Sequence, residues 1–358
     1  MQALMMYSFH TKERDTLPIT QTGHSVTFLI PFRNECDVLK DCVDSIVKQA
    51  AALVQYEILL LDDHSDDGSS DIARQLSQTQ DSIHYIRCTK HGKKHALAEG
   101  NQRANHAWIF TADADCTYND VRFNDLVSYT SSKALDVLAL PVLIKPSSSF
   151  SGNYQFWDSL GLMLVTVNAL HHRWFLSASG AAMLYRKKSF CSIKPYDDNF
   201  RIASGDDQFL LYAFRQKGLR QLQMMKHVDQ KVWTKAASNW RDIVQQRLRW
   251  ASKSQILRDG VLNLFLQING AANLMIVLGL PLSLFEIRIL YGVLLIYGLK
   301  MAVEGVLLYS AAHFWKVQSK GKYLLLTTLI QPFLVVFIVT NYVFKKRIIW
   351  KNRYIKHN

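Results

Sequence analysis

The sequence contains few of the residues that mark fibrous, low-complexity and zinc-binding proteins. Its 358 residues include 16 glycines, 7 prolines and 5 cysteines. So little glycine and proline excludes a collagen-like or low-complexity chain. The cysteines form no Cys-x-x-Cys pair, so the usual spacing of structural zinc ligands is missing. Scattered single thiols are typical of a reducing compartment.

Acidic residues are scarce towards the C-terminus. The chain has 42 Lys and Arg against 29 Asp and Glu, a net charge of +13, and residues 261–358 hold 11 of the basic and 2 of the acidic residues. With 49% apolar residues, the composition excludes a disordered chain. A basic and apolar tail indicates a membrane surface, whereas a nucleic-acid-binding face would interleave basic and aromatic residues. We therefore expect membrane lipids, and no nucleic acid, as partners.

The composition of the first residues bears on where the first domain lies. Residues 1–15 include no apolar run of signal-peptide length. We therefore expect the first domain to stay in the cytoplasm.

Strand and helix signals alternate in the first half of the chain. Short apolar runs predict buried strands at residues 25–31, 57–61, 83–87 and 108–111. Apolar residues at helical spacing predict helices at residues 35–49, 66–76 and 94–106. Further segments predict strands at 136–142 and 181–185, and helices at 156–175, 205–216 and 240–254. This alternation predicts an α/β fold with a parallel sheet covered on both faces, in which ligands bind beyond the carboxyl ends of the strands.

Three long apolar stretches follow, at residues 261–285, 287–311 and 323–344. Each is close to the roughly 20 residues that cross a bilayer. The first contains four side-chain amides, so it either lies in the membrane interface or faces other helices. In the second, Lys300 and Glu304 lie four residues apart, and we expect them to pair with each other.

The charges of the C-terminal tail bear on membrane topology. Six basic residues follow Phe344, where we expect them to contact anionic lipid heads. The positive-inside rule places them in the cytoplasm with the first domain, which requires an even number of crossings. The stretch at 261–285 is then interfacial; the alternative is that all three stretches cross.

Two acidic clusters follow predicted strands. Asp62 and Asp63 come after the second strand, and Asp113 and Asp115 follow the fourth. Because parallel strands deliver ligand sites at their carboxyl ends, we expect these carboxylates to face one site. Paired carboxylates suit a hard divalent cation that keeps water and phosphate oxygens in its shell. The alternative for Asp62 and Asp63 is a role in helix capping and turn formation.

A basic helix start lies between the two clusters. Gly92, Lys93 and Lys94 can meet phosphates or a base through backbone N–H and ammonium groups. The alternative is a solvated helix start. The segment is not a P-loop, and no Gly-x-Gly-x-x-Gly follows the first strand, which disfavours a dinucleotide-dependent dehydrogenase.

Six motifs in a fixed order resemble glycosyltransferase family 2. They are FLIPFRNE, LLLDDHSDDGS, HGKKHALAEG, FTADAD, SGDDQFLL and QRLRW. The resemblance runs from about residue 25 to residue 250. It implies a GT-A fold, a Rossmann-like nucleotide-sugar-binding domain, and we assign residues 1–24 to an N-terminal extension, 25–258 to this domain and 259–358 to a membrane-associated helical region.

The resemblance assigns residues to the sugar-nucleotide donor. Residues that match the donor pocket are Pro31, Arg33 and Glu35 at its opening, Asp62 and Asp63 at the uracil or its ribose, and Lys93 and Lys94 near the nucleotide. Asp113 and Asp115 match the motif that binds Mg²⁺ or Mn²⁺ through the donor diphosphate.

The resemblance also assigns the catalytic and acceptor residues. Asp206 and Asp207 match a Glu-Asp pair whose Asp is the general base. Gln246, Arg249 and Trp250 match the Gln-x-x-Arg-Trp motif that closes over the diphosphate and the acceptor sugar; the alternative for Trp250 is an aromatic residue at the membrane interface.

Two positions depart from the family pattern. Asp206 is one methylene shorter than the usual Glu, which weakens the assignment of the base. His64 stands where glycine is common, and we expect it to be a turn residue rather than a ligand.

The chemistry of sugar transfer fits these roles. Charge develops on the leaving diphosphate, where a cation stabilises it, and a carboxylate takes the proton of the attacking hydroxyl. One base without a second carboxylate as nucleophile implies inversion. We therefore expect a UDP-sugar donor and a lipid-linked or polysaccharide acceptor at the cytoplasmic membrane, with single transfer favoured over processive synthesis. The alternatives are a polyprenyl-phosphate sugar transferase, a processive polysaccharide synthase and an inactive GT-A scaffold.

Overall fold

The computed structural model describes residue 17 and residues 23–172, 178–197, 199–200, 205–218, 221–254, 260–317, 321–344, 347–350 and 353–356. Nearly all of the expected extension at residues 1–24, and residues 173–175 of one expected helix, lie outside this set.

The chain forms two compact units. One comprises residues 14–143 and 169–235, which we call the sheet unit, and the other comprises residues 1–13, 144–168 and 236–358, which we call the helical unit. The segment at 236–258, which the sequence places with the first domain, packs in the helical unit.

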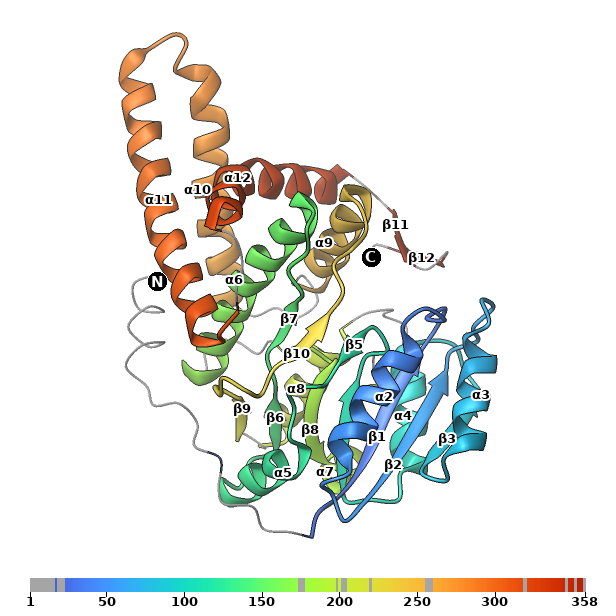
Figure 1. Ribbon diagram of the computed structural model, residues 1–358. Coiled ribbons are helices and arrows are strands. Elements are labelled where there is room, and N and C mark those ends of the chain that lie inside the picture. Colours follow the sequence, from blue (N-terminus) through green and yellow to red (C-terminus); the bar gives the residue numbers. More distant parts are fainter. Residues whose placement is uncertain are drawn as a thin grey trace. The chain divides into compact units, whose positions relative to one another are not determined.

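A seven-stranded sheet forms the centre of the sheet unit, in the order β3-β2-β1-β4-β8-β6-β9 (Figure 1). Its strands are β1 (Ser25–Phe32), β2 (Gln55–Asp62), β3 (Ile83–Arg87), β4 (Trp108–Ala112), β6 (Val137–Ala139), β8 (Ala182–Arg186) and β9 (Leu222–Met224). The first four are parallel, and β8 runs antiparallel to both β4 and β6. The prediction of an α/β sheet is confirmed, with antiparallel pairing added at one side.

Helices cover both faces of the parallel strands. The helices of the sheet unit are α2 (Leu39–Ala50), α3 (Ser69–Thr79), α4 (Lys93–Arg103), α5 (Phe123–Ser132), α7 (Lys187–Ile193) and α8 (Asp206–Gln216). Along β1, Phe28 belongs to the core cluster that also contains Val43 of α2, whereas Leu29 approaches Gly100 of α4. A Cβ at Gly100 would lie 2.6 Å from Leu61, so the glycine lets α4 pack directly on β2. Burial on both faces explains why these strands are continuous apolar runs.

One predicted strand is interrupted. The run at residues 136–142 forms β6 and then β7 (Val142–Ile144), which belongs to a second sheet with β5 (Cys116–Thr117) and β10 (Val232–Thr234). Pro141 stands between β6 and β7. Proline has no N–H to donate to a sheet, so the chain leaves the first sheet there.

The helical unit contains five helices among the described residues. They are α6 (Phe150–His172, whose last four residues fall in the sheet unit), α9 (Trp240–Ser254), α10 (Gly260–Leu282), α11 (Ile287–Phe314) and α12 (Gly321–Phe344). A short hairpin of β11 (Arg347–Trp350) and β12 (Arg353–Lys356) forms within the basic tail, which the sequence analysis did not predict.

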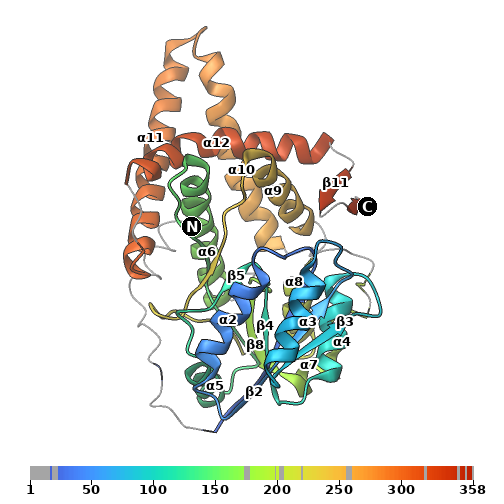
Figure 2. The ribbon, with the colours of Figure 1, turned by 45° about the vertical axis from the view of Figure 1, so that its right-hand side comes forward.

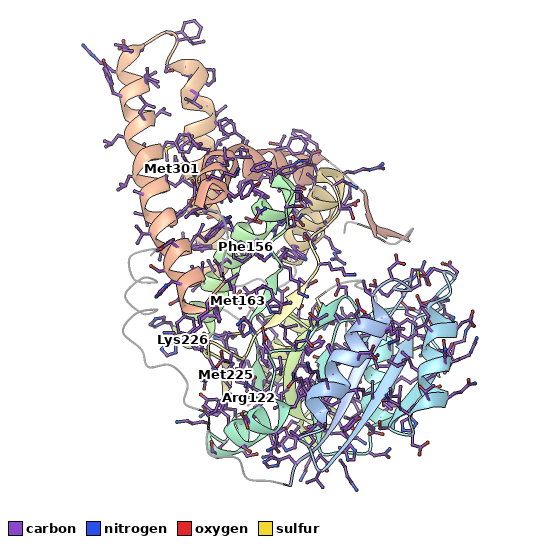
Figure 3. All side chains as sticks on the ribbon, in the orientation of Figure 1. Arg122, Phe156, Met163, Met225, Lys226 and Met301 are labelled. Atoms are coloured by element: carbon purple, nitrogen blue, oxygen red, sulfur yellow. The ribbon has the colours of Figure 1, made fainter. Side chains whose placement is uncertain are left out.

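Three of the described helices, α10, α11 and α12, are long and apolar enough to cross a membrane. Helices α10 and α11 form an antiparallel hairpin, and α12 runs across them in both views (Figures 1 and 2). Side chains project outward along this hairpin (Figure 3), and many of its large apolar side chains are exposed. The predicted pair of Lys300 and Glu304 is confirmed: the ammonium lies 2.6 Å from both carboxylate oxygens and 2.6 Å from Gln331 Oε1 of α12.

Candidate active site

The sheet brings the first two loops of the site together. Strands β1 and β2 are parallel and in register from Ser25↔Gln55 to Phe32↔Asp62, so both chains leave the same edge. Pro31 is buried within β1, opposite Leu61, and it therefore contributes to the strand rather than to an open surface.

Hydrogen bonds join these two loops. Arg33 Nη1 donates to the carbonyl oxygens of Asp63 at 2.9 Å and His64 at 3.0 Å. The Glu35 amide donates to Ser69 Oγ at 2.8 Å. Arg33 and the Glu35 backbone thus shape the loop after β2, which is a positioning role that the motif alone did not reveal.

Asp62 is engaged within the protein. It is fully buried, its Oδ1 accepts from the Ser65 amide at 2.8 Å, and its Oδ2 accepts from Ser70 Oγ at 2.6 Å and Tyr85 Oη at 2.9 Å. Burial raises the pKa of this carboxyl, but the hydrogen bonds outweigh burial and hold it below its usual range. These contacts correspond to the capping and turn alternative for Asp62.

Asp63 has a different environment. Its Oδ1 accepts from the Gly92 amide at 2.8 Å and lies 3.8 Å from His91 Nδ1. The loop after β2 therefore meets the loop before α4.

Lys93 joins three segments of the site. Its Nζ lies 2.6 Å from Asp113 Oδ1, after β4, and 3.0 Å from Asp206 Oδ2, at the start of α8. Burial alone would lower the pKa of the Lys93 ammonium, but the two carboxylates raise it above its usual range. Burial raises the pKa of the Asp113 carboxyl; Lys93 opposes this effect, and the Asp115 and Asp206 carboxylates add to it.

Tyr118 fixes the loop after β4 through two hydrogen bonds. Tyr118 Oη accepts from the Asp113 amide at 3.0 Å and donates to the Ala181 carbonyl at 2.7 Å. Asp115 is exposed beside it. The tyrosine therefore orients Asp113 while Asp115 remains accessible to a ligand.

Asp206 and Asp207 open α8, after Gly205 in a left-handed conformation with φ +87°. Both side chains are buried, and Asp207 Oδ1 accepts from the Gln208 amide at 2.8 Å. Carboxylates are stabilised in the first turn of a helix by its exposed N–H groups. Asp206 also contacts Lys93, which connects the start of α8 to the loop after β4.

Lys94 points away from Lys93 and its carboxylates. Its Nζ donates to the Asn199 carbonyl at 2.9 Å and lies 4.0 Å from the centre of the Phe209 ring. The side chain is buried. Lys93 contacts both Asp113 and Asp206.

Gly180 is a site residue that the sequence analysis missed. A Cβ at this position would lie 2.5 Å from Asp206 Oδ2 and 3.4 Å from Lys93 Nζ. Only glycine leaves room for the Lys93–Asp206 contact. The glycine in Ser179-Gly180 before β8 carries no motif of its own, so only its three-dimensional neighbours reveal this role.

Gln246, Arg249 and Trp250 lie on α9, in the helical unit. Within that unit, Arg247 Nη2 pairs with Asp158 of α6, and its guanidinium lies 4.3 Å from the centre of the Trp250 ring. Arg247 therefore anchors α9 to α6 and packs on Trp250. The predicted roles of Gln246, Arg249 and Trp250 at the diphosphate and acceptor stay predictions.

The residues present fit a divalent cation bound together with a diphosphate. Among the described residues, no three His, Cys, Asp or Glu side chains are grouped to hold an ion by themselves. Mg²⁺, however, is commonly held by one or two carboxylates plus substrate phosphates and water. Asp113 and Asp115 supply two carboxylates one residue apart, one of them exposed.

Comparison with known proteins gives a consistent result. Residues 27–191 match the model of Glycosyl transferase family 2. Glycosyltransferase AglE of Haloferax volcanii is 28% identical over 121 residues, which are 34% of this chain and 40% of that protein. Poly(ribitol-phosphate) beta-glucosyltransferase of Bacillus spizizenii is 34% identical over 64 residues, which are 18% of this chain and 10% of that protein. The alignments thus span less than half the length of these two relatives.

A solved structure shares the fold over nearly the whole chain. It is mannosyltransferase PcManGT from Pyrobaculum calidifontis in complex with GDP-Man and Mn²⁺, with a TM-score of 0.58, 16% identity, and coverage of 96% of this chain and 95% of that chain. The predicted GT-A-like domain followed by apolar helices is confirmed. Residues 27–191 thus match Glycosyl transferase family 2, and nearly the whole chain shares the fold of a mannosyltransferase.

Proposed function

We propose that this chain is a glycosyltransferase that moves a sugar, with inversion, from a UDP-sugar to a lipid-linked or polysaccharide acceptor at the cytoplasmic face of a membrane. One observation carries the proposal: Lys93, at the start of α4, links the loop after β4 to the start of α8, because it contacts both Asp113 and Asp206. A sugar nucleotide needs cationic and metal-binding groups for its diphosphate and a carboxylate for the acceptor, and these residue types are adjacent there.

In this proposal Asp113 and Asp115 hold Mg²⁺ or Mn²⁺. The ion, when bound, neutralises charge that develops on the diphosphate as it leaves. Lys93 supplies a second positive charge beside Asp113, at a distance of 2.6 Å.

Asp207 is the proposed general base. Its Oδ1 accepts from the Gln208 amide at the start of α8, which fixes the orientation of the carboxylate. A carboxylate is a general base because it can accept a proton from a hydroxyl group. The acceptor hydroxyl loses its proton to Asp207 as its oxygen attacks the anomeric carbon, and the nucleoside diphosphate leaves from the opposite face. A single displacement of this kind inverts the anomeric configuration.

The helical unit supports a lipid-associated acceptor. It contains three helices that are apolar enough to enter a bilayer, and the family motif residues Gln246, Arg249 and Trp250 belong to the same unit. A polyprenyl phosphate is the alternative acceptor within this class, because it too would be presented from a membrane.

The proposal is tested by incubating the full chain in detergent with a panel of UDP- and GDP-sugars and Mg²⁺ or Mn²⁺. We expect metal-dependent release of UDP from one UDP-sugar, and faster release when a lipid or glycan acceptor is added. Competition by a short polyprenyl phosphate, without competition by soluble sugars, would assign the alternative acceptor. Turnover of GDP-sugars alone would reject UDP as the donor nucleotide, and no turnover of any sugar nucleotide would favour an inactive scaffold.

A further inference from the structure

Two neighbouring lysines attach the start of α4 to α8. Lys93 Nζ lies 3.0 Å from Oδ2 of Asp206, the first residue of α8. Lys94 Nζ lies 4.0 Å from the centre of the Phe209 ring, one turn further along the same helix. The two helices are thus joined at two points, and the second has no part in the transfer chemistry proposed above.

Phe209 packs on the turn that begins α8. A Cβ at Gly205 would lie 3.2 Å from Cε2 of the Phe209 ring, and the Phe209 amide donates to the Gly205 carbonyl at 2.9 Å. Gly205, with its φ of +87°, directly precedes Asp206 and Asp207. A displacement of the Phe209 ring would therefore move the turn that carries both carboxylates.

Lys94 also contacts the segment that leads to α8. Its Nζ donates to the Asn199 carbonyl at 2.9 Å. The ring of the next residue, Phe200, stacks on His95 of α4, with ring centres 4.1 Å apart and an interplanar angle of 4°. The Asn199 amide donates to the Tyr196 carbonyl at 2.8 Å. Two consecutive residues of α4 thus contact two consecutive residues of this segment.

The same segment packs beside the acidic pair. Tyr196 is buried and lies against Phe190 of α7, with ring centres 5.6 Å apart. Burial raises the pKa of the Tyr196 hydroxyl well above its usual range, and the carboxylates of Asp206 and Asp207 raise it further. The segment that α4 holds is therefore close to both carboxylates.

A buried ammonium is a costly way to fill this space. Lys94 is 4% exposed. Burial of a charge costs free energy unless polar groups or an aromatic face compensate it, whereas an apolar side chain of the same length would fill the volume without that cost. The Asn199 carbonyl and the Phe209 ring face provide such compensation. Because both contacts depend on direction as well as distance, the ammonium holds the two segments in a defined position.

We propose that Lys94 is a positioning residue for sugar transfer, which acts through Phe209 and the Asn199 carbonyl to set where α8 places Asp207. This inference rests on the proposed function, in which Asp207 is the general base. A base must lie within hydrogen-bond reach of the acceptor hydroxyl, so its position affects the rate of transfer. The alternative, which comes from the family resemblance, is that Lys94 binds the nucleotide of the donor.

The experiment compares Lys94→Met with the wild type, using the full chain in detergent. Methionine keeps most of the volume and removes the charge. We expect kcat for transfer from the UDP-sugar that the wild type uses to fall about tenfold or more, because a displacement of about 1 Å can cost about 100-fold in rate. The KM for the UDP-sugar and the calorimetric affinity for UDP with Mn²⁺ should not change. The value of kcat is referred to the number of UDP-binding sites, so unfolded protein does not contribute.

Further variants identify the route by which Lys94 acts. Phe209→Leu alone should lower kcat, and adding Lys94→Met to it should lower kcat little further, because both changes interrupt one contact. His95→Phe preserves the stack on Phe200 and should keep the wild-type kcat, whereas His95→Ala should lower it. Lys90→Met, which removes an exposed lysine shortly before α4, is the matched control and should leave kcat unchanged.

The possible failures are distinguishable. A wild-type kcat in Lys94→Met would overturn the positioning role and leave the proposed transferase intact. Weaker binding of UDP in Lys94→Met would overturn it too, since Lys94 would then act on the donor. Fully additive losses in Lys94→Met and Phe209→Leu would exclude the route through Phe209 and reject the proposal. A wild-type rate in Asp207→Asn would overturn the proposed base and this inference together.

Discussion

Lys93 Nζ lies 2.6 Å from Asp113 Oδ1, so the proposed metal-binding motif already has a positive partner within the protein. The same ammonium reaches Asp206 at 3.0 Å. Lys93 and a bound metal ion would both compensate the negative charge of Asp113, so we expect them to compete for this carboxylate.

We predict that Lys93→Ala binds Mn²⁺ more tightly than the wild type when no nucleotide is present. Removing the ammonium leaves Asp113 and Asp206 without their shared cation, and a divalent ion can then compensate them. One ion pair at this distance near a protein surface is worth more than about 1 kcal/mol, so we expect roughly tenfold tighter binding. Titration of Mn²⁺ followed by electron paramagnetic resonance measures it.

Lys93→Arg is the control for this change. It keeps the positive charge and should leave the Mn²⁺ affinity of the nucleotide-free protein near that of the wild type. Equal Mn²⁺ affinity in Lys93→Ala and the wild type would show that Lys93 does not compete with a cation at Asp113.

Asp207→Asn should reduce sugar transfer by at least about 100-fold, the lower range for loss of a general base. Asn keeps an oxygen that can accept from the Gln208 amide, so the start of α8 should remain intact. The affinity for UDP with Mn²⁺ should therefore not change. Steady-state kinetics together with a UDP titration measure both quantities, and transfer within a few-fold of the wild type would remove Asp207 as the base.

Asp115→Ala should abolish the effect of metal on nucleotide binding. Asp115 is exposed, so its loss should not alter folding. The readout is the ratio of UDP affinities with and without Mn²⁺, which should fall to about one. Asp81→Ala, an exposed carboxylate before β3, should retain the wild-type ratio. A retained ratio in Asp115→Ala would contradict the metal role.

Glu57 gives a prediction about stability and pH. It is 4% exposed on β2 and accepts from Thr27 Oγ1 at 2.6 Å and Asn105 Nδ2 at 2.7 Å. Burial raises the pKa of Glu57, but these hydrogen bonds outweigh burial and lower it below its usual value near 4.5. A lowered pKa in the folded protein means that the stabilisation is present above pH 4.5 and is lost as pH falls through the folded value.

Glu57→Gln should therefore destabilise the chain at pH 7 by about 1–3 kcal/mol. Glutamine replaces one acceptor oxygen by an N–H₂ group, which cannot accept the hydrogen bonds that Thr27 and Asn105 donate. The difference from the wild type should shrink as pH falls below 4.5. Thermal unfolding midpoints of both proteins at pH 7 and pH 4 measure this. A difference that is independent of pH would mean that the carboxylate charge makes no contribution.

The α10–α11 hairpin should enter the membrane as one unit, with its tip on the far side. Helix α10 has 23 residues, or about 34 Å, against a hydrocarbon thickness of about 30 Å. Leu284 and Phe285 at the tip are 85% and 88% exposed. Crossings by α10 and α11 give the expected even number, but with residues 261–285 crossing the membrane instead of lying in its interface as the sequence analysis expected.

Cysteine labelling in oriented vesicles tests this topology. Native Cys191 is exposed on α7 and reports the side of the catalytic unit. Leu284→Cys in a Cys191→Ser background should react with a membrane-impermeant maleimide only from the opposite side. Labelling of both cysteines from one side would place the hairpin along the membrane surface.

Local patterns in the chain were enough to predict where the parallel strands lie along the sequence and where carboxylates follow them. The apolar run of β1 and the Asp-x-Asp after β4 are properties of consecutive residues, and strand spacing depends on such short-range patterns. The pairing of Lys300 with Glu304 was predictable for the same reason, since residues four apart in a helix share a face.

Contacts between segments that are distant in the sequence were revealed only by the tertiary structure. No short stretch of sequence shows that Arg33 donates a hydrogen bond to the carbonyl of Asp63 after β2. The same is true of Gly180, which leaves room for Lys93 beside Asp206, and of the His64 and His91 rings, which pack together. These residues lie far apart in the chain, and their neighbours depend on how helices pack on a sheet. Packing depends on many side chains at once, so it can be read from the three-dimensional structure but not from any short segment of the sequence.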